Sequence, residues 1–243
     1  MANGNGNGKI NDISPLGIKS PLKFLFVSKE SASGDLARTV KDEGHEVKVY
    51  IKVRGDADVY DGFLDKVEKW EDWADWSDII IFDHVEFGEQ ADRLRKKGKL
   101  VVGGSSYTDR LEIDRSFGQA ELKSRGINVL PSWNFSNYDE ALEFIRNNPT
   151  RYVFKPSGNT PSANKNLLFL SEEEDGKDVI RMLENYKNVW AKKIKEFQIQ
   201  KRVTGVEVAV GAFFNGKEFV YPINVNFEHK KLFPGDIGVS TGD

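Results

Sequence analysis

Cysteine is absent from this 243-residue chain, which excludes disulfide bonds and thiolate zinc sites and fits a reducing, cytoplasmic location. Long apolar runs are absent too. The longest, such as Ile79–Phe82, are a fraction of what a bilayer crossing needs, so we expect no membrane span. A large excess of one charge is also absent, since the formal net charge is -3 and the pI is about 5.8. Such a chain has no broad attraction for phosphodiesters, so we expect no sequence-independent nucleic-acid binding.

Two glycine-rich signatures are also missing. The GxxxxGK[ST] spacing of a Walker loop does not occur, and no GxGxxG follows the first predicted strand. A nicotinamide-dependent dehydrogenase is therefore a weak alternative for this chain. The composition that remains is that of a globular protein, with 39% hydrophobic and 30% charged residues, and the length suits one large domain or two modest ones.

The first part of the chain predicts a leader followed by a small α/β domain. Asparagine and glycine alternate at the start and favour turns, so we expect residues 1–20 to form a flexible leader. After that, short β-branched and aromatic runs alternate with helical stretches. The expected strands are 24–27, 45–51, 79–82 and 100–102. Short continuous apolar runs suit buried parallel strands, so residues 21–106 predict a doubly wound parallel-sheet domain.

This domain also contains a tryptophan repeat and a basic cluster, neither of which predicts a ligand-binding site. Trp70, Trp73 and Trp76 have a three-residue spacing that most often places one helical face on a core. The basic cluster around Arg93–Lys97 most often forms a solvated helix face. We expect structural roles for both.

The remaining sequence predicts connecting helices and then an α+β region. Residues 107–150 should hold a helix over 107–125, a strand over 127–130 and a helix introduced by a capping box at Ser136–Asp139. Residues 151–243 should contain antiparallel strands, a helix after a second capping box at Ser171–Glu174, and a tight hairpin turn at Asn215-Gly216. The strands expected there are 152–154 and 167–170, followed by three consecutive antiparallel strands at 197–203, 206–214 and 219–225.

Three segments of the second region could bind a ligand. Lys155 ends an apolar strand and faces a loop of small polar residues, an arrangement that can surround a polyphosphate with an ammonium and N–H groups. Glu207 follows a glycine kink and could accept hydrogen bonds from ribose hydroxyls. The last strand leads into His229-Lys230-Lys231 and then repeated glycines, which could meet an anionic substrate. Taken alone, the first segment is more often a connecting loop and the second more often a solvated hairpin, and the third could be a disordered tail.

Together, the order and spacing of these segments resemble the ATP-grasp carboxylate–amine ligases, and among them the glycinamide ribonucleotide synthetase family. That family has a lysine-ending strand, a small-residue lid and a second lysine, at the positions of Lys155 and Lys165. Its hinge, Glu-Glu-Phe-Leu-x-Gly-x-Glu, is similar to residues 200–207. Its later motif, Asp-His-Lys-Arg followed by Gly-Asp-x-Gly-x-x-Thr-Gly, is similar to 228–231 and 235–242. The similarity extends from about residue 22 to the end.

The resemblance implies a small pre-ATP-grasp domain followed by an incomplete ATP-grasp fold, and a ligase that activates a carboxylate as an acyl phosphate before an amine attacks it. It places Arg115, Lys155 and Lys165 on the phosphates of ATP, Glu207 on the ribose, and the backbone from Lys201 to Val203 on adenine. It also assigns a group of residues to the second substrate, and these are His229, Lys230, Gly235, Asp236 and Thr241. By resemblance, the acid is glycine and the amine is phosphoribosylamine.

Magnesium should bridge the phosphates, but the acidic strand that coordinates it in this family would follow residue 243. We therefore expect no metal ligands within this chain. The sequence predicts either a fragment, one chain of a split enzyme whose second chain completes the fold, or a remnant that binds nucleotide without turnover.

The departures from the family pattern define the alternatives. Ser28–Asp35 replaces the family's Gly-Gly-Arg-Glu-His phosphoribosyl loop, which favours an ATP-grasp ligase for another acid and amine. Gln200 and Lys201 replace the two hinge acids, which favours a non-catalytic nucleotide-binding or assembly module.

Overall fold

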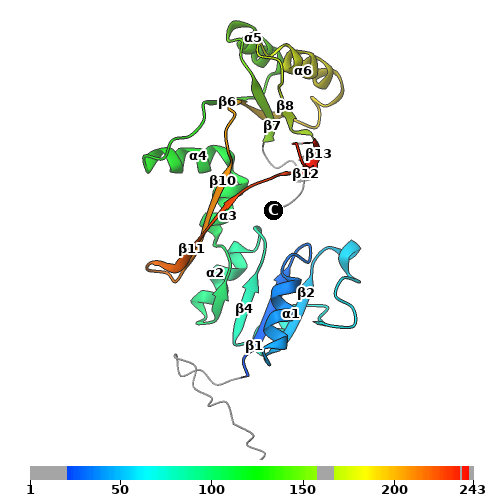
Figure 1. The fold of residues 1–243 in the computed structure, drawn as a ribbon, viewed down its shortest axis with the longest axis vertical. Helices are drawn as coiled ribbons and strands as arrows, with labels where there is room; N and C mark the ends of the chain where they lie inside the picture. Colours follow the sequence, from blue (N-terminus) through cyan, green and yellow to red (C-terminus); the bar gives the residue numbers. More distant parts are fainter. Residues whose placement is uncertain (1–20, 158–166, 236, 241–243) are drawn as a thin grey trace, which may run out of the picture. The chain divides into compact units, whose positions relative to one another are not determined.

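The chain divides into two compact units between Val129 and Leu130 in the computed structural model, which describes residues 21–157, 167–235 and 237–240 (Figure 1). The division falls inside the range expected to connect two domains. None of the helices within these described ranges is long and apolar enough to cross a membrane.

The first unit is built on a parallel sheet. Its five strands stand in the order β3-β2-β1-β4-β5, and every neighbouring pair is parallel. They are β1 (Lys23–Ser28), β2 (Glu46–Ile51), β3 (Asp65–Lys66), β4 (Ile79–Phe82) and β5 (Leu100–Val102). The four strands predicted from the sequence are confirmed, and the structure adds the two-residue edge strand β3. The expected doubly wound sheet is therefore present.

Each face of this sheet has its own core. Helix α1 (Gly34–Asp42) contributes Ala37 and Val40 to a cluster with Phe26 on one face. Helix α2 (Gly88–Lys96) contributes Ala91 and Leu94 to a cluster with other strand residues on the opposite face. Because successive strand residues point to opposite faces, an unbroken apolar strand such as β1 supplies both cores.

The tryptophan segment packs on the α2 side of the sheet, but not as an α-helix. It forms a short 3-10 turn, η2 (Glu71–Trp73), and Trp70 and Trp73 lie against the core. A 3-10 helix has three residues per turn, so residues spaced by three stack above one another. The expected structural role is confirmed while the expected helix type is wrong. A second such turn, η1 (Arg54–Asp56), follows β2.

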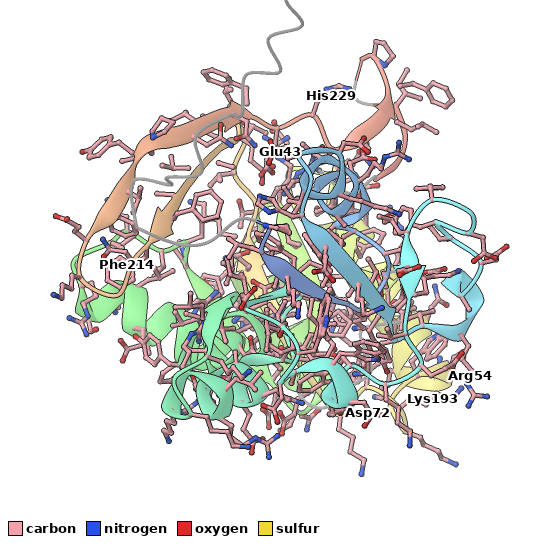
Figure 2. The ribbon with its side chains drawn as sticks, turned by 90° about the horizontal axis from the view of Figure 1, so that it is seen from below. Glu43, Arg54, Asp72, Lys193, Phe214 and His229 are labelled. Carbon is pink, nitrogen blue, oxygen red and sulfur yellow. The ribbon has the colours of Figure 1, made fainter. Side chains whose placement is uncertain are left out.

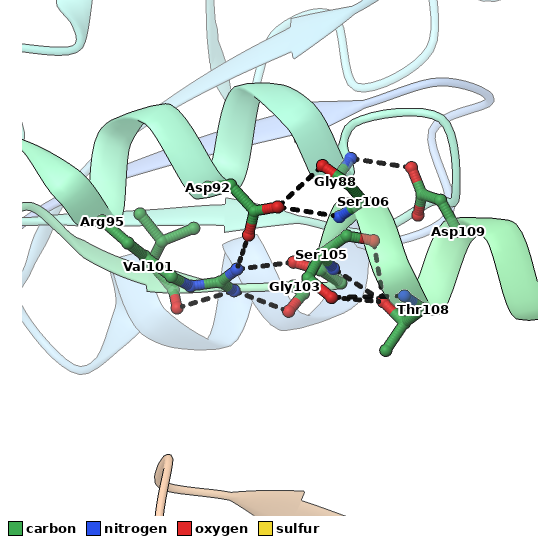
Figure 3. Close-up of polar contacts among 10 residues, drawn as sticks. Gly88, Asp92, Arg95, Val101, Gly103, Ser105, Ser106, Thr108 and Asp109 are labelled. Atoms are coloured by element: carbon green, nitrogen blue, oxygen red, sulfur yellow. Dashed lines mark hydrogen bonds and ion pairs between the residues drawn. The ribbon is translucent and has the colours of Figure 1, made fainter.

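The basic face of α2 is not entirely solvated. Arg95 donates hydrogen bonds to the carbonyls of Gly103 and Gly104, each at 2.7 Å, where the chain leaves β5 (Figure 3). Asp92, one turn earlier, accepts from the backbone N–H of Ser106 at 2.9 Å and from its hydroxyl at 2.7 Å. These bonds, the backbone one foremost, lower the pKa of the Asp92 carboxyl. Two charged side chains of α2 thus fasten the loop that starts the next helix.

One correction concerns the helix expected over 107–125. The structure has two helices there, α3 (Ser106–Ile113) and α4 (Arg115–Ser124). Asp114 separates them, and its carboxylate accepts a hydrogen bond from Phe117 N–H at 3.0 Å. A short acidic side chain that caps the second helix competes with continuation of the first.

The second unit contains an antiparallel sheet with strand order β6-β9-β7-β8. Its strands are β6 (Ser132–Phe135), β7 (Tyr152–Ser157), β8 (Phe169–Leu170) and β9 (Glu196–Lys201). The strand expected over 127–130 is wrong, because pairing starts only after Pro131. Proline has no N–H to donate to a ladder, but its carbonyl accepts from Lys201 N–H at 2.9 Å.

Two helices of the second unit, α5 (Tyr138–Asn147) and α6 (Lys177–Val189), pack their apolar sides against residues of β7 and β9. Neither expected capping box forms. Asn137, not Ser136, caps α5 by accepting from Asp139 N–H at 2.8 Å. Helix α6 begins after Gly176, which has a φ of 71° that favours glycine.

Two hairpins complete the described part of this unit. Strands β10 (Val208–Phe214) and β11 (Phe219–Phe227) form one, and β12 (Lys231–Phe233) and β13 (Ile237–Ser240) form the other. The turn predicted at Asn215-Gly216 is confirmed, although only Gly216 of that pair has a positive φ, 94°. The expectation that strand 197–203 belongs with these strands is wrong, because β9 pairs with β6 and β7.

Tyr138 gives the second unit a testable alkaline sensitivity. Its side chain is 5% exposed, its hydroxyl donates to Ile194 O at 3.3 Å, and burial raises its pKa to about 12. A folded-state pKa above the unfolded value stabilises the fold fully below about pH 10 and loses that effect as the pH rises toward 12. At pH 11 the loss should be about 1 kcal/mol.

We expect Tyr138→Phe to lose less stability than wild type between pH 9 and pH 11, in urea unfolding followed by fluorescence. Tyr221→Phe, at a 79% exposed position, is the matched control and should behave as wild type. Equal losses in wild type and Tyr138→Phe would contradict the burial argument.

Candidate functional site

The sheet of the second unit has one apolar face and one polar face. On β7, Tyr152 and Phe154 lie in the core, while Lys155 is at an alternate position and so lies on the other face of the strand. On β9, Phe197 and Ile199 lie in the same core, and Gln198 and Gln200 alternate with them. The two glutamines are nevertheless only 1% and 8% exposed. A buried polar row therefore lines the face away from α5 and α6.

This row is hydrogen-bonded across three strands. The Lys155 ammonium donates to Gln200 Oε1 at 2.5 Å, and Gln198 Nε2 donates to Asn134 Oδ1 at 3.1 Å. The strand register places Lys155 opposite Gln198, and Gln198 opposite Asn134. An amide oxygen can orient an ammonium without adding negative charge beside it. The arrangement therefore presents a positioned cation on a polar surface, which suits an anionic ligand.

The residues at the end of β9 form backbone hydrogen bonds with other parts of the second unit. Lys201 N–H donates to Pro131 O and Arg202 N–H donates to Arg151 O, both at 2.9 Å. These two donors are already used within the protein. Val203, which is 54% exposed, follows them and lies at the start of the glycine-containing connection. Of the backbone donors assigned to adenine by resemblance, that of Val203 fits the role best.

Glu207 and Lys230, which were expected to meet different ligands, contact each other. Lys230 Nζ lies 2.6 Å from Glu207 Oε1 and 2.9 Å from Glu228 Oε2. The backbone joins the same segments, since Glu228 N–H donates to Glu207 O at 3.1 Å. Hydrogen bonds to the two carboxylates, that of Glu207 first, hold the pKa of Lys230 above its usual range. Lys230 is therefore a cation at any physiological pH.

The structure describes some of the other residues that the resemblance assigns to the second substrate. His229 Nε2 lies 3.3 Å from Phe233 O, so this ring is in contact with the β12 segment. Gly235 has a φ of 79° in the turn between β12 and β13, where glycine is favoured. Asp236 and Thr241, like Lys165 of the lid, lie outside the described residues.

Arg115 belongs to the first unit. It is the first residue of α4 and lines a cavity of ≈ 290 Å³ formed by α3 and α4. A cation at a helix N-terminus adds its charge to that of the helix dipole, so the position can attract phosphate. The cavity also contains Glu112, Gly118 and Gln119, so its lining is mixed rather than purely basic.

A larger cavity of ≈ 590 Å³ in the first unit was not anticipated. Four acidic side chains contribute to its lining, and these are Glu86, Glu89, Asp109 and Asp114. Arg110 also lines it, but the acids outnumber this cation, so the cavity is less suited to an anionic nucleotide than a basic one would be. No local sequence signal marks it, because its lining comes from a loop and two separate helices.

The polar row was only partly visible in the sequence. Lys155 was identified, but Gln198 and Asn134 were not. The signal for Gln198 was present, since Phe197-Gln198-Ile199-Gln200 alternates apolar and amide side chains at the two-residue period of a strand.

Comparison with known proteins defines the class first. A crystal structure of phosphoribosylamine–glycine ligase from Thermotoga maritima superposes with a TM-score of 0.64 at 20% identity, covering 90% of this chain and 54% of that one. The fold, a parallel-sheet domain followed by the antiparallel sheet with its lysine, is that of the ATP-grasp ligases.

The family follows from the sequence. The sequence model of the family called phosphoribosylglycinamide synthetase, ATP-grasp (A) domain, matches residues 113–243, which is more than half of the chain. The chain therefore belongs to this family. Phosphoribosylamine–glycine ligase of Methanocorpusculum labreanum is 30% identical over 152 residues, covering 62% of this chain and 33% of that protein. The Methanobrevibacter smithii ligase is 27% identical over 234 residues, covering 91% and 52%. The chain thus spans about a third to a half of these relatives.

The Glu207–Lys230 contact should stabilise the fold only weakly. Both side chains are about half exposed, at 58% and 48%. Exposed ion pairs contribute about 0.2–1 kcal/mol, so a double-mutant cycle of Glu207→Gln and Lys230→Met should give a coupling in that range. Urea unfolding of the four proteins measures it. A coupling above about 2 kcal/mol would contradict the interpretation of this contact as a weak, exposed ion pair.

Proposed function

We propose that this chain is the nucleotide-binding part of an ATP-dependent carboxylate–amine ligase of purine biosynthesis. The observation on which the proposal rests is the Lys155 ammonium, held by Gln200 on the polar face of the second unit's sheet. Family membership supports the same assignment. The names of the relatives support glycine and phosphoribosylamine as the acid and the amine. A cytoplasmic location remains part of the proposal.

ATP would supply the phosphoryl group that activates the carboxylate. The chain's own residues would bind and orient it, since charge neutralisation and positioning are the main tasks of a phosphoryl-transfer site. Lys155, with Lys165 and Arg115, would meet the phosphates, Glu207 the ribose, and the backbone near Lys201 and Val203 the adenine. The second substrate would contact the residues assigned to it by resemblance, and these are His229, Lys230, Gly235, Asp236 and Thr241.

The described residues do not fit a magnesium site. Within residues 21–157, 167–235 and 237–240, no group of three or more His, Asp or Glu side chains could hold a metal ion. Glu207 and Glu228 lie together, but they share the Lys230 ammonium. The proposal therefore names no residue of this part of the chain as a metal ligand.

A ligase for another acid and amine is the second candidate, and the loop after β1 favours it. The hydroxyls of Ser28 and Ser33 donate to Asp83 Oδ2 at 2.6 Å and 2.7 Å. At the position of the family's phosphoribosyl loop, this loop therefore contacts the Asp83 carboxylate. A carboxylate repels the phosphate of a phosphoribosyl substrate. Phosphate release from ATP, measured with glycine plus phosphoribosylamine and with other acid and amine pairs, separates the two candidates.

Lys155→Ala should weaken ADP binding by about tenfold or more, because a charge-assisted hydrogen bond to phosphate is lost. Isothermal calorimetry measures the affinity. Lys187→Ala removes an exposed lysine of the same unit, paired with Asp139 at 2.6 Å, and should bind ADP as wild type does. An unchanged affinity in Lys155→Ala would remove the basis of the proposal.

Gln200→Glu tests whether the neutral partner of Lys155 matters. A carboxylate at this position would hold the ammonium equally well but would add a negative charge beside the phosphates, so ADP affinity should fall by about tenfold. The drop should be smaller for adenosine, which has no phosphate. A loss equal for ADP and adenosine would indicate a damaged fold instead of a charge effect.

A further inference from the structure

One ammonium joins two carboxylates at the open end of the β10–β11 hairpin. Glu207 directly precedes β10, Glu228 directly follows β11, and Lys230 lies two residues further along the chain. Lys230 Nζ lies 2.6 Å from Glu207 Oε1 and 2.9 Å from Glu228 Oε2. We call these three residues the lysine triad. The connection that carries Glu228 and Lys230 can be located in Figure 2 by the label on His229.

The two carboxylates of the lysine triad differ in their exposure to water. The side chain of Glu207 is 58% exposed, whereas that of Glu228 is 16% exposed. A carboxylate that is withdrawn from water needs its counter-ion more than one that water can solvate. The contact of Lys230 with Glu228 is therefore the one that the protein keeps. The contact with Glu207 is an exposed ion pair, which can be given up with little loss of free energy.

The proposed function gives Glu207 another set of partners, which are the ribose hydroxyls of ATP. Two neighbouring hydroxyls can donate to both oxygens of one carboxylate, so the ribose competes with the Lys230 ammonium for Oε1 of Glu207. An ammonium has three donors, and this exchange releases the donor that Glu207 accepts in the absence of nucleotide. Lys230 stays close to the site because Glu228 still holds it.

We propose that the ribose of a nucleotide and the ammonium of Lys230 compete for Glu207, and that Glu228 is the positioning residue that retains Lys230 when the ribose binds. The inference rests on the proposed function, because it requires that Glu207 binds the ribose. In the nucleotide-free chain, a cation of the protein thus occupies the ribose-binding carboxylate. The exchange frees a donor of Lys230 once the nucleotide has bound.

Isothermal calorimetry with two nucleotides measures this competition. The probes are ADP and 2′,3′-dideoxy-ADP, which has the same base and phosphates but lacks both ribose hydroxyls that could donate to a carboxylate. The ratio of their affinities, which we call the ribose preference, separates the hydroxyl contacts from charge effects on the phosphates. The variants are Lys230→Met and Glu228→Gln. Lys231→Met is the matched control, because it removes the same charge from the adjacent residue.

The two variants should change the ribose preference in opposite directions. Lys230→Met should raise it by about two- to fivefold, because the hydroxyls no longer have to displace an exposed ion pair. Glu228→Gln should lower it by about twofold, because Glu207 is then the only carboxylate of the lysine triad left to the ammonium, which becomes harder to displace. Lys231→Met should have the ribose preference of the wild type.

An unchanged ribose preference in Lys230→Met or in Glu228→Gln would overturn the proposal, as would a shift in the same direction in both. Glu207→Gln separates this outcome from a failure of the proposed function. If Glu207→Gln removes the ribose preference while Lys230→Met leaves it unchanged, Glu207 binds the ribose and only the competition is wrong. If Glu207→Gln has no effect on the ribose preference, or the wild type does not bind ADP, the ribose assignment is wrong and the competition with it.

Discussion

The two-residue period of β7 and β9 is the constraint on which the core and the candidate site of the second unit both depend. The same alternation that buries Phe154 and Ile199 under α5 and α6 places Lys155 and Gln200 on the other face. A slip of one residue would drive a lysine into an apolar core and expose the aromatic residues. The apolar residues therefore position the site residues through register, without touching a ligand.

Much of the fold could be predicted where the signal was local. The strands β4 and β5 are continuous apolar runs, and their bounds in the structure are those expected from the sequence. The turn at Gly216 follows from the conformational freedom of glycine. Lys155 could be identified because a charged residue that ends an apolar strand and precedes a polar loop is unusual. In each case a few neighbouring residues determine the structure.

Other features could not be predicted because they depend on distant partners. Strand β9 looks like the first of three consecutive antiparallel strands, but it pairs with β6 and β7, whose residues lie far earlier in the chain. Gln200, 45 positions from Lys155, could be identified as its partner only from that pairing. Arg95 looked like part of a solvated face until its carbonyl partners after β5 were known. Asp114 broke an expected helix through a single side-chain bond.

Two of the antiparallel sheets in the described part of the second unit, that of β7 and β9 and that of β10 and β11, each have one mainly apolar face. In the sheet of β7 and β9, helices cover the apolar face, while the face of β10 and β11 that matches it stays exposed among the described residues. The opposite faces also correspond, since Gln198 and Gln200 have counterparts in Asn224 and Asn226. Amides can donate and accept hydrogen bonds without charge, whereas carboxylates in these positions would repel phosphates. Strand alternation thus gives each sheet one apolar side and one side that carries uncharged amide side chains.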